Sequence, residues 1–278
     1  MKTWALFGSL CIAGFALSVP ASAGPVLLTG HDPDFHSAFG QPDGKQQLQV
    51  FLNFVTGGTY NSGTSKFLYV QSNLAPPAGF LDGEVGLTNI GLTAGTNYDA
   101  VDAAGLPSVN FANYSAIVVA SSFGGMLTAA EINALVARSA DIASFVNSGG
   151  GLAAFAECFP SSGVCDASNV TASTPLFGFV PVNVSSVPTT APYHVTLFGA
   201  GLGLTDAIVS DCCTHNSFSL TGGLTVVDLD LNNIPTTLAG DVHITDGTFV
   251  PVVAEPAALA VLGLGLAAFG FLRRSRAT

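Results

Sequence analysis

The chain has 278 residues, of which 49% are hydrophobic and only 9% are charged, and its formal net charge is −11 at pH 7. All 18 acidic residues lie between Gly24 and Glu255, and only three basic residues accompany them there. Proteins bind nucleic acids and anionic lipid surfaces through lysine and arginine side chains. The excess of acidic residues therefore argues against both classes of partner. The residues between the two chain ends suffice for one large α/β or all-β domain, or for two small ones.

The first 23 residues are predicted to be a secretory signal peptide. Lys2 is followed by an apolar run from Ala5 to Leu17 and then by the small residues Ala21-Ser22-Ala23. This order of a positive, an apolar and a small-residue region defines a cleavable signal, and the run is short for a membrane span. We expect signal peptidase to cut after Ala23, so that the exported chain begins at Gly24. A buried first strand or helix is the alternative.

The exported chain begins by alternating between strand-like and helix-like segments. We predict a strand at Pro25–Thr29, a helix at about Pro42–Val55 with apolar residues at helical spacing, and a strand at Lys66–Gln71. A glycine-rich stretch with short helical turns is expected to follow as far as Asn97.

The middle of the chain predicts a parallel βαβ unit. Tyr114–Ser122 is a continuous apolar run, as expected of a strand buried on both faces. Thr128 and Glu131 have the spacing of a capping box, which opens one amphipathic helix that ends at the three glycines 149–151. A second buried strand, "LAAFAE", follows directly. Strand, helix and strand with short connections favour parallel pairing.

Beyond Phe159 the pattern changes to short β-like runs separated by glycine, proline and asparagine. These runs are either later strands of the same sheet or a small β-rich flank. The fold class predicted for residues 24–245 is therefore α/β, a flavodoxin-like, doubly wound and mainly parallel sheet with a more β-rich C-terminal part. Residues 246–256 are expected to be a tether.

The C-terminal end predicts a transmembrane helix. Ala257–Leu272 is a run of 16 residues without a charge, about 24 Å long as a helix. Arg273, Arg274 and Arg276 follow at once. After a signal peptide such a run stops translocation, so the tail 273–278 stays cytoplasmic and the body lies outside the inner membrane. A buried core helix is the alternative.

Together, Glu255-Pro256, the apolar helix and the basic tail resemble the PEP-CTERM sorting signal of Gram-negative bacteria, although Ala254 stands where the motif has its first proline. The resemblance implies recognition by an exosortase, after an intermediate stage anchored in the inner membrane. It also implies release to the cell surface or the extracellular matrix, where exopolysaccharide is a candidate partner.

Candidate site residues cluster where the first strand ends, in the segment "HDPDFH". In a doubly wound sheet, ligands bind outside the carboxyl ends of the strands, where we expect His31, Asp32, Asp34 and His36 to lie. All four can bind a divalent metal ion, but their spacing matches no named metal motif. A structural or substrate-facing loop is the alternative, and we predict no cofactor or metal.

The four cysteines of the exported chain are disulfide candidates, because export places them in an oxidising compartment. They are Cys158, Cys165, Cys212 and Cys213. Either Cys158 closes a small loop with Cys165, or these two pair with the adjacent Cys212 and Cys213. Cys158 also follows a strand, as a nucleophile does, and His194 or His215 could then serve as its base.

Three segments, "PVLLTGHDPDFH", "YSAIVVASSFGG" and "GGGLAAFAECFP", resemble the class I glutamine amidotransferase-like superfold, including its trehalose-utilisation branch. The resemblance covers Pro25–Pro160 and implies a nucleophilic Cys158 on a sharp turn, with His215 in the role of the late histidine. The family's Gly-x-Cys-x-Gly turn is altered here, since Ala156 and Pro160 stand at the glycine positions.

Two further strand ends could line the same pocket. Glu157 is an acid at the end of a buried strand and is a weak catalytic candidate beside Cys158 and His215. The segment "SSFGG" could bind an anion through its amides at the start of the following helix. Its candidate residues are Ser121, Ser122, Gly124 and Gly125.

These observations support two functional hypotheses. The first is an exported surface or matrix protein with a non-catalytic, amidotransferase-like domain in a binding or structural role. The second is an extracellular hydrolase or carbohydrate-modifying enzyme that uses the His, Asp, Glu and Cys residues at the strand ends.

Overall fold

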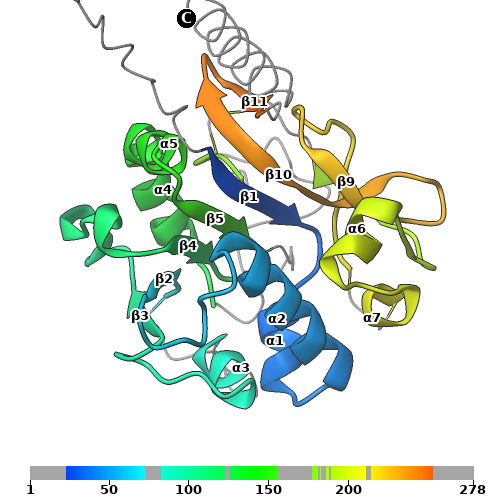
Figure 1. The fold of residues 1–278 in the computed structure, drawn as a ribbon, viewed down its shortest axis with the longest axis horizontal. Coiled ribbons are helices and arrows are strands. Elements are labelled where there is room, and N and C mark those ends of the chain that lie inside the picture. Colours follow the sequence, from blue (N-terminus) through cyan, green and yellow to red (C-terminus); the bar gives the residue numbers. More distant parts are fainter. Residues whose placement is uncertain are drawn as a thin grey trace, which may run out of the picture.

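The computed structural model describes residues 23–72, 83–122, 126–155, 177–180, 182, 186–187, 189–210 and 214–252. Within them the chain forms a mixed α/β fold around a central sheet (Figure 1). The sheet contains β1 (Gly24–Thr29), β2 (Phe67–Val70), β3 (Tyr98–Val101), β4 (Ala116–Val119), β5 (Gly151–Ala154), β7 (His194–Val195), β9 (Thr225–Leu229), β10 (Pro235–Thr245) and β11 (Thr248–Pro251). A separate two-stranded sheet pairs β6 (Ser186–Val187) with β8 (Ser217–Phe218).

The helices of the described chain connect or flank these strands. They are α1 (Pro33–Ala38), α2 (Pro42–Val55), α3 (Gly83–Asn89), α4 (Ala129–Ala137), α5 (Ser139–Asn147), α6 (Leu197–Leu202) and α7 (Asp206–Ser210), with 3-10 turns η1 (Leu106–Ser108) and η2 (Phe111–Asn113). Figure 1 shows α1, α2 and α3 grouped beside one another, and α1 packs against both of the others.

The parallel part of the sheet follows the order β3-β2-β4-β5-β1. Every residue of β2, β4 and β5 is buried, which is why these strands read as uninterrupted apolar runs. The predicted buried strand around Ala116–Val119 and the predicted parallel pairing with the strand at Gly151 are therefore confirmed. Parallel pairing also places the carboxyl ends of β1, β4 and β5 at one edge of the sheet.

The strand order differs from the flavodoxin-like arrangement that the sequence predicted. In that arrangement the first strand lies between the second and third, whereas here β1 lies between β5 and β10. The pairing of β1 with β10 is antiparallel and extends over all six residues of β1. The predicted order was wrong, because β1 pairs with β5 and not with β2, a choice that local sequence patterns do not reveal. The pairing with β10, the longest described strand, was also missed, because its mixed polar and apolar sequence gave no strand signal.

The predicted tether at 246–256 begins with a turn that is followed by the strand β11. Asp246 and Gly247 both have positive φ angles and join β10 to β11 in a tight hairpin in which Thr245 faces Thr248. Asp-Gly is a preferred pair for such a two-residue turn, so the sequence did carry this signal. The globular part therefore extends at least to Pro251.

The single long helix predicted after Thr128 is two helices. The capping box at Thr128 and Glu131 is confirmed, and Gly149 follows α5 with a φ of 94°. Between α4 and α5, Arg138 leaves the helical conformation with a φ of −112° and a ψ of 17°. Its guanidinium donates hydrogen bonds to the carbonyl oxygens of Leu106 and Val109, contacts that the local apolar pattern cannot show.

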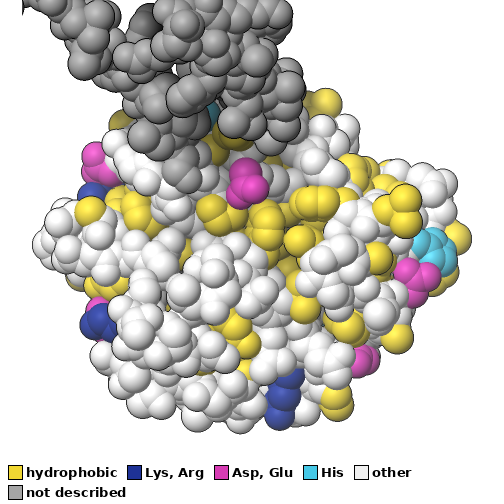
Figure 2. Space-filling view, in the orientation of Figure 1, with side chains coloured by type: hydrophobic (Ala, Val, Ile, Leu, Met, Phe, Trp, Pro, Cys, Tyr) yellow, Lys and Arg dark blue, Asp and Glu magenta, His cyan; other side chains and the backbone are white. Residues whose placement is uncertain are grey.

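The face of the molecule seen in Figure 2 bears few basic residues, in keeping with the composition. In the part of the chain that the structure describes, no helix is both long and apolar enough to cross a membrane. The predicted signal peptide and the predicted transmembrane helix at 257–272 lie outside the described residues.

Gly30 allows the chain to close over the end of β1. A Cβ atom at this position would lie 1.6 Å from the carbonyl oxygen of Asn216, which is a backbone atom and cannot swing away. Gly30 itself donates to the carbonyl of Thr236 at 2.7 Å and accepts from the amide of His215 at 2.9 Å.

We expect Gly30→Ala to lower the free energy of unfolding by about 1–3 kcal/mol or more, because the new methyl group overpacks the contact with residues 214–216. Chemical denaturation measures the change. Gly201→Ala is the matched control, since Gly201 lies in α6 with no atom within 4 Å of the added Cβ, and it should gain about 0.5–1 kcal/mol. Equal stability of the two variants would contradict the assigned contact.

Candidate metal site at the end of β1

The segment "HDPDFH" is the start of a helix instead of the predicted loop. Pro33 is the first residue of α1, where its missing N–H costs nothing, and Asp32 is the N-cap. Asp32 and His36 are therefore four residues apart at a helix N-terminus, the spacing that places two side chains on one face.

Asp32, His36 and His215 converge on one point. Nε2 of His36 lies 3.3 Å from Oδ1 of Asp32, and Nε2 of His215 lies 3.9 Å from the same oxygen. One candidate ligand atom from each of the three residues lies within 4.8 Å of the other two. Two ligands bound to zinc at 2.0–2.1 Å and at tetrahedral angles would be about 3.3 Å apart, so the set is close to the size that a metal ion needs.

His36 is oriented by a partner on its other ring nitrogen. Its Nδ1 is hydrogen-bonded to the amide oxygen of Gln41, the N-cap residue of α2. Because an amide oxygen can only accept, Nδ1 carries the proton and a neutral His36 presents the lone pair of Nε2 toward Asp32. That nitrogen is buried and has no hydrogen-bond partner among the described residues. Histidines that bind metals are usually oriented in this way.

His215 reaches the site from the distant part of the chain. Its backbone amide donates to Gly30, and its side chain is 32% exposed. Burial and the nearby imidazoles of His36 and His31 lower the pKa of His215 from 6.5 to about 4. The ring is therefore neutral at physiological pH, the form in which histidine binds metal ions.

His31 lies beside the site without belonging to it. Nε2 is 2.8 Å from the carboxylate of Asp228, and Nδ1 is hydrogen-bonded to the hydroxyl of Thr214. Both ring nitrogens are thus used, and the expectation that His31 would bind a ligand with its neighbours is corrected by these contacts.

Asp34 has a structural role, contrary to its prediction as a ligand-binding residue. It is fully buried and accepts hydrogen bonds from the hydroxyl of Tyr69 at 2.7 Å and from the amides of Ser121 and Phe35 at 2.9 and 3.0 Å. Burial raises the pKa of Asp34 above its usual 3.8. The amide after β4 is therefore occupied by the protein's own Asp34 carboxyl group, which anchors α1 to β2 and β4.

The structure describes only some of the remaining predicted site residues. Ser121 and Ser122 are buried at the carboxyl end of β4. His194 is exposed and its Nδ1 lies 3.4 Å from Asp206, so His215 is the late histidine that reaches the strand ends. The other candidates lie outside the described residues: Glu157, Cys158, Gly124, Gly125, the cysteines 165, 212 and 213, and the sorting-signal residues Glu255, Pro256, Arg273, Arg274 and Arg276.

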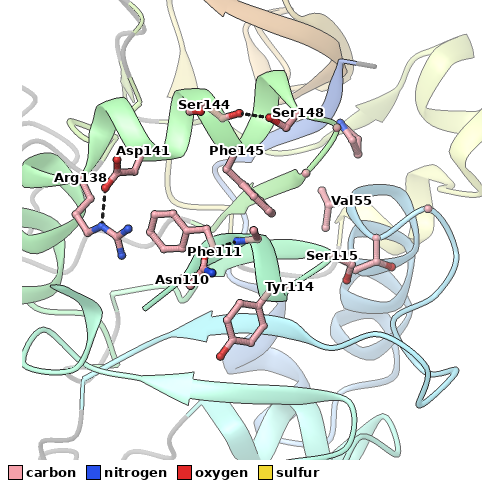
Figure 3. A pocket seen from close by; sticks show the side chains of 16 residues that line it. Val55, Asn110, Phe111, Tyr114, Ser115, Arg138, Asp141, Ser144, Phe145 and Ser148 are labelled. Atoms are coloured by element: carbon pink, nitrogen blue, oxygen red, sulfur yellow. Dashed lines mark hydrogen bonds and ion pairs between the residues drawn. The ribbon is translucent and has the colours of Figure 1, made fainter. Parts of the chain in front are cut away.

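A groove of about 630 Å³ lies at the opposite edge of the sheet, at the amino ends of β1, β4 and β5 (Figure 3). The positively charged residue in this groove is Arg138. Its Nε donates to Oδ2 of Asp141 at 2.9 Å, and its guanidinium carbon lies 3.9 Å from the ring centroid of Phe111. The same guanidinium also binds two backbone carbonyls. These charges are satisfied within the protein, and none of the predicted site residues lines the groove.

The comparisons with known proteins are negative. No protein family model, no curated protein and no solved structure matches the chain.

Sequence reasoning missed three residues that shape the site, namely Gln41, Thr214 and Asp228. Asp228 could have been found, because an acid inside a strand of valine and leucine requires a buried partner. Gln41 and Thr214 act through contacts that depend on the fold and left no sequence signal.

In the metal-free protein, the ring protons of His215 should titrate with a midpoint near pH 4, which NMR can follow with His215→Gln identifying the resonance. The unfolded chain takes up this proton near pH 6.5. As the pH falls from 6.5 toward 4, protonation therefore favours unfolding, and wild type should lose stability relative to His215→Gln. A midpoint at or above 6.5 would contradict the buried environment assigned to the ring.

Proposed function

We propose that this chain is an exported protein whose α/β domain binds one divalent transition metal ion through Asp32, His36 and His215. The observation that carries the proposal is the buried Nε2 of His36, which faces a carboxylate oxygen at 3.3 Å while Gln41 binds Nδ1. A lone pair and a carboxylate repel each other unless a cation lies between them. A metal ion would supply that cation and would also engage His215.

The ligand types favour zinc over the alkaline-earth ions. Two imidazole nitrogens and one carboxylate are a ligand set of Zn²⁺ and of Fe²⁺, whereas Ca²⁺ and Mg²⁺ select oxygen ligands. A proton shared between His36 and Asp32 is the competing explanation, and it would leave the protein without metal affinity.

The chain ends support export. A signal peptide pattern and a pattern resembling the PEP-CTERM signal bracket an acidic domain with very few basic residues. We infer surface or matrix localisation, with signal peptidase and exosortase as partners during export. The resemblance of Pro25–Pro160 to amidotransferase-like proteins stays a prediction. The strand order of this domain differs from the flavodoxin-like order that the sequence predicted, and this difference counts against a close relationship.

The exposed edge of His215 favours a second candidate function, a metal-dependent hydrolase. Structural zinc sites use four protein ligands, whereas catalytic ones use three and keep a position for water. The described residues offer three, one of them partly exposed. An ion at such a position can polarise an ester or amide carbonyl and activate water. Hydrolysis of 4-nitrophenyl acetate should then follow Zn²⁺ occupancy; activity that persists unchanged after chelation would exclude this candidate.

We expect calorimetry to show that the purified protein binds one Zn²⁺ ion. Zn²⁺ at a concentration of about 100 times its Kd should raise the free energy of unfolding by about 2.7 kcal/mol. His215→Ala should weaken binding by more than about 100-fold, since disturbing even an outer partner of a ligand typically costs 10–100-fold.

His194→Ala is the matched control, because His194 is also paired with an aspartate but lies on the exposed surface. It should bind Zn²⁺ like wild type. The proposal fails if wild type binds no Zn²⁺, if His215→Ala keeps full affinity, or if Ca²⁺ or Mg²⁺ competes on equal terms.

A further inference from the structure

His31 connects three separate segments beneath the proposed metal site. It follows β1, whereas Thr214 precedes β8 and Asp228 lies in β9, beyond β10. The imidazole bonds Thr214 on one ring nitrogen and Asp228 on the other. In the neutral form, Nε2–H donates to the carboxylate and Nδ1 accepts from the hydroxyl of Thr214.

Asp228, the residue that bonds Nε2 of His31, is itself fixed to the sheet. Asp228 is fully buried, and its second oxygen accepts a hydrogen bond of 2.6 Å from Thr236 of β10. His31 is itself only 2% exposed. A buried imidazole bonded at both nitrogens has little freedom to rotate, so it fixes Thr214 relative to the strands.

Thr214 is the neighbour of the ligand His215. Its backbone meets that of His31 in a single isolated β-bridge. Tyr193 adds a hydrogen bond of 3.2 Å from its hydroxyl to the carbonyl of Thr214, and its ring packs edge-on against that of His31. The amide of His215 also donates to the carbonyl of Gly30, and the side-chain contacts add to these few backbone contacts in fixing where residues 214–216 lie.

We propose that the Thr214–His31–Asp228 contacts position His215 within ligand distance of Asp32 and His36. The inference rests on the proposed metal site. All three are positioning residues, because His31 uses both ring nitrogens on Thr214 and Asp228, and Asp228 uses its second oxygen on Thr236. This positioning role gives a reason for the buried side chains of His31, Asp228 and Thr214 to contact one another beside the three candidate ligands.

Thr214→Val tests the inference, because valine keeps the shape of threonine and replaces only the hydroxyl with a methyl group. We expect Zn²⁺ affinity to fall about tenfold, at the low end of the effects of outer partners. Co²⁺ serves as a second probe: its visible absorption reports ligand geometry and should change in Thr214→Val, which a loss of stability alone would not cause.

Thr56→Val is the matched control. Thr56 is 6% exposed, as is Thr214, and its hydroxyl donates to the carbonyl of Leu52 at 2.7 Å at the end of α2. This variant should lose comparable stability but keep the Zn²⁺ affinity and Co²⁺ spectrum of wild type. Thr214→Ser keeps a hydroxyl and should restore both readouts.

The possible outcomes separate the two proposals. Wild-type affinity and spectrum in Thr214→Val overturn the positioning role while the metal site stands, whereas absence of Zn²⁺ binding in wild type overturns both. If Thr214→Val does not fold, Asp228→Asn replaces it, because the amide cannot accept from both His31 and Thr236 as the carboxylate does. Unchanged affinity in that variant also overturns the inference.

Discussion

The antiparallel pairing of β1 with β10 is the interaction on which the rest of this structure depends. It extends over the whole of β1, from Gly24 facing Val242 to Thr29 facing Thr237. Through β10 it brings β9, with the buried Asp228, within reach of the residues that follow β1. The parallel part supplies much of the apolar core, and the antiparallel extension supplies Asp228, a buried partner of His31 at the end of β1.

The proposed site combines one local and one distant element. Asp32 and His36 are placed by a single helical turn that Pro33 initiates, so their relation follows from neighbouring residues alone. His215 is held by contacts between residues that are far apart in the chain, Thr214 with His31 at a separation of 183 positions and His31 with Asp228 at a separation of 197. The close backbone approach at Gly30 and the buried contacts of His31 together hold the distant ligand against the local pair.

Sequence reasoning succeeded where the determining forces are local. The helix Pro42–Val55 has the predicted bounds, and the capping box at Thr128 was identified by its spacing. It failed where the outcome depends on distant partners: β10 gave no strand signal, and the helix break at Arg138 depends on two carbonyls of another segment. Within the site, His31, Asp34 and His36 looked equivalent in sequence. Only their partners, Asp228, Tyr69 and Gln41, distinguish a positioning residue, an anchor and a candidate ligand.

The interior position of β1 also constrains the order of events during biosynthesis. β1, the first of the described strands, pairs with β10, one of the last, so the pairing on both sides of β1 is complete only after β10 has been synthesised. Such long-range pairing delays folding, because chain closure must precede the contacts that stabilise it. If the chain is exported, as we propose, this delay is an advantage, because a polypeptide that has not yet folded can be passed through a membrane. The candidate ligands would then meet in the compartment where folding finishes, and any ion they capture would be drawn from there.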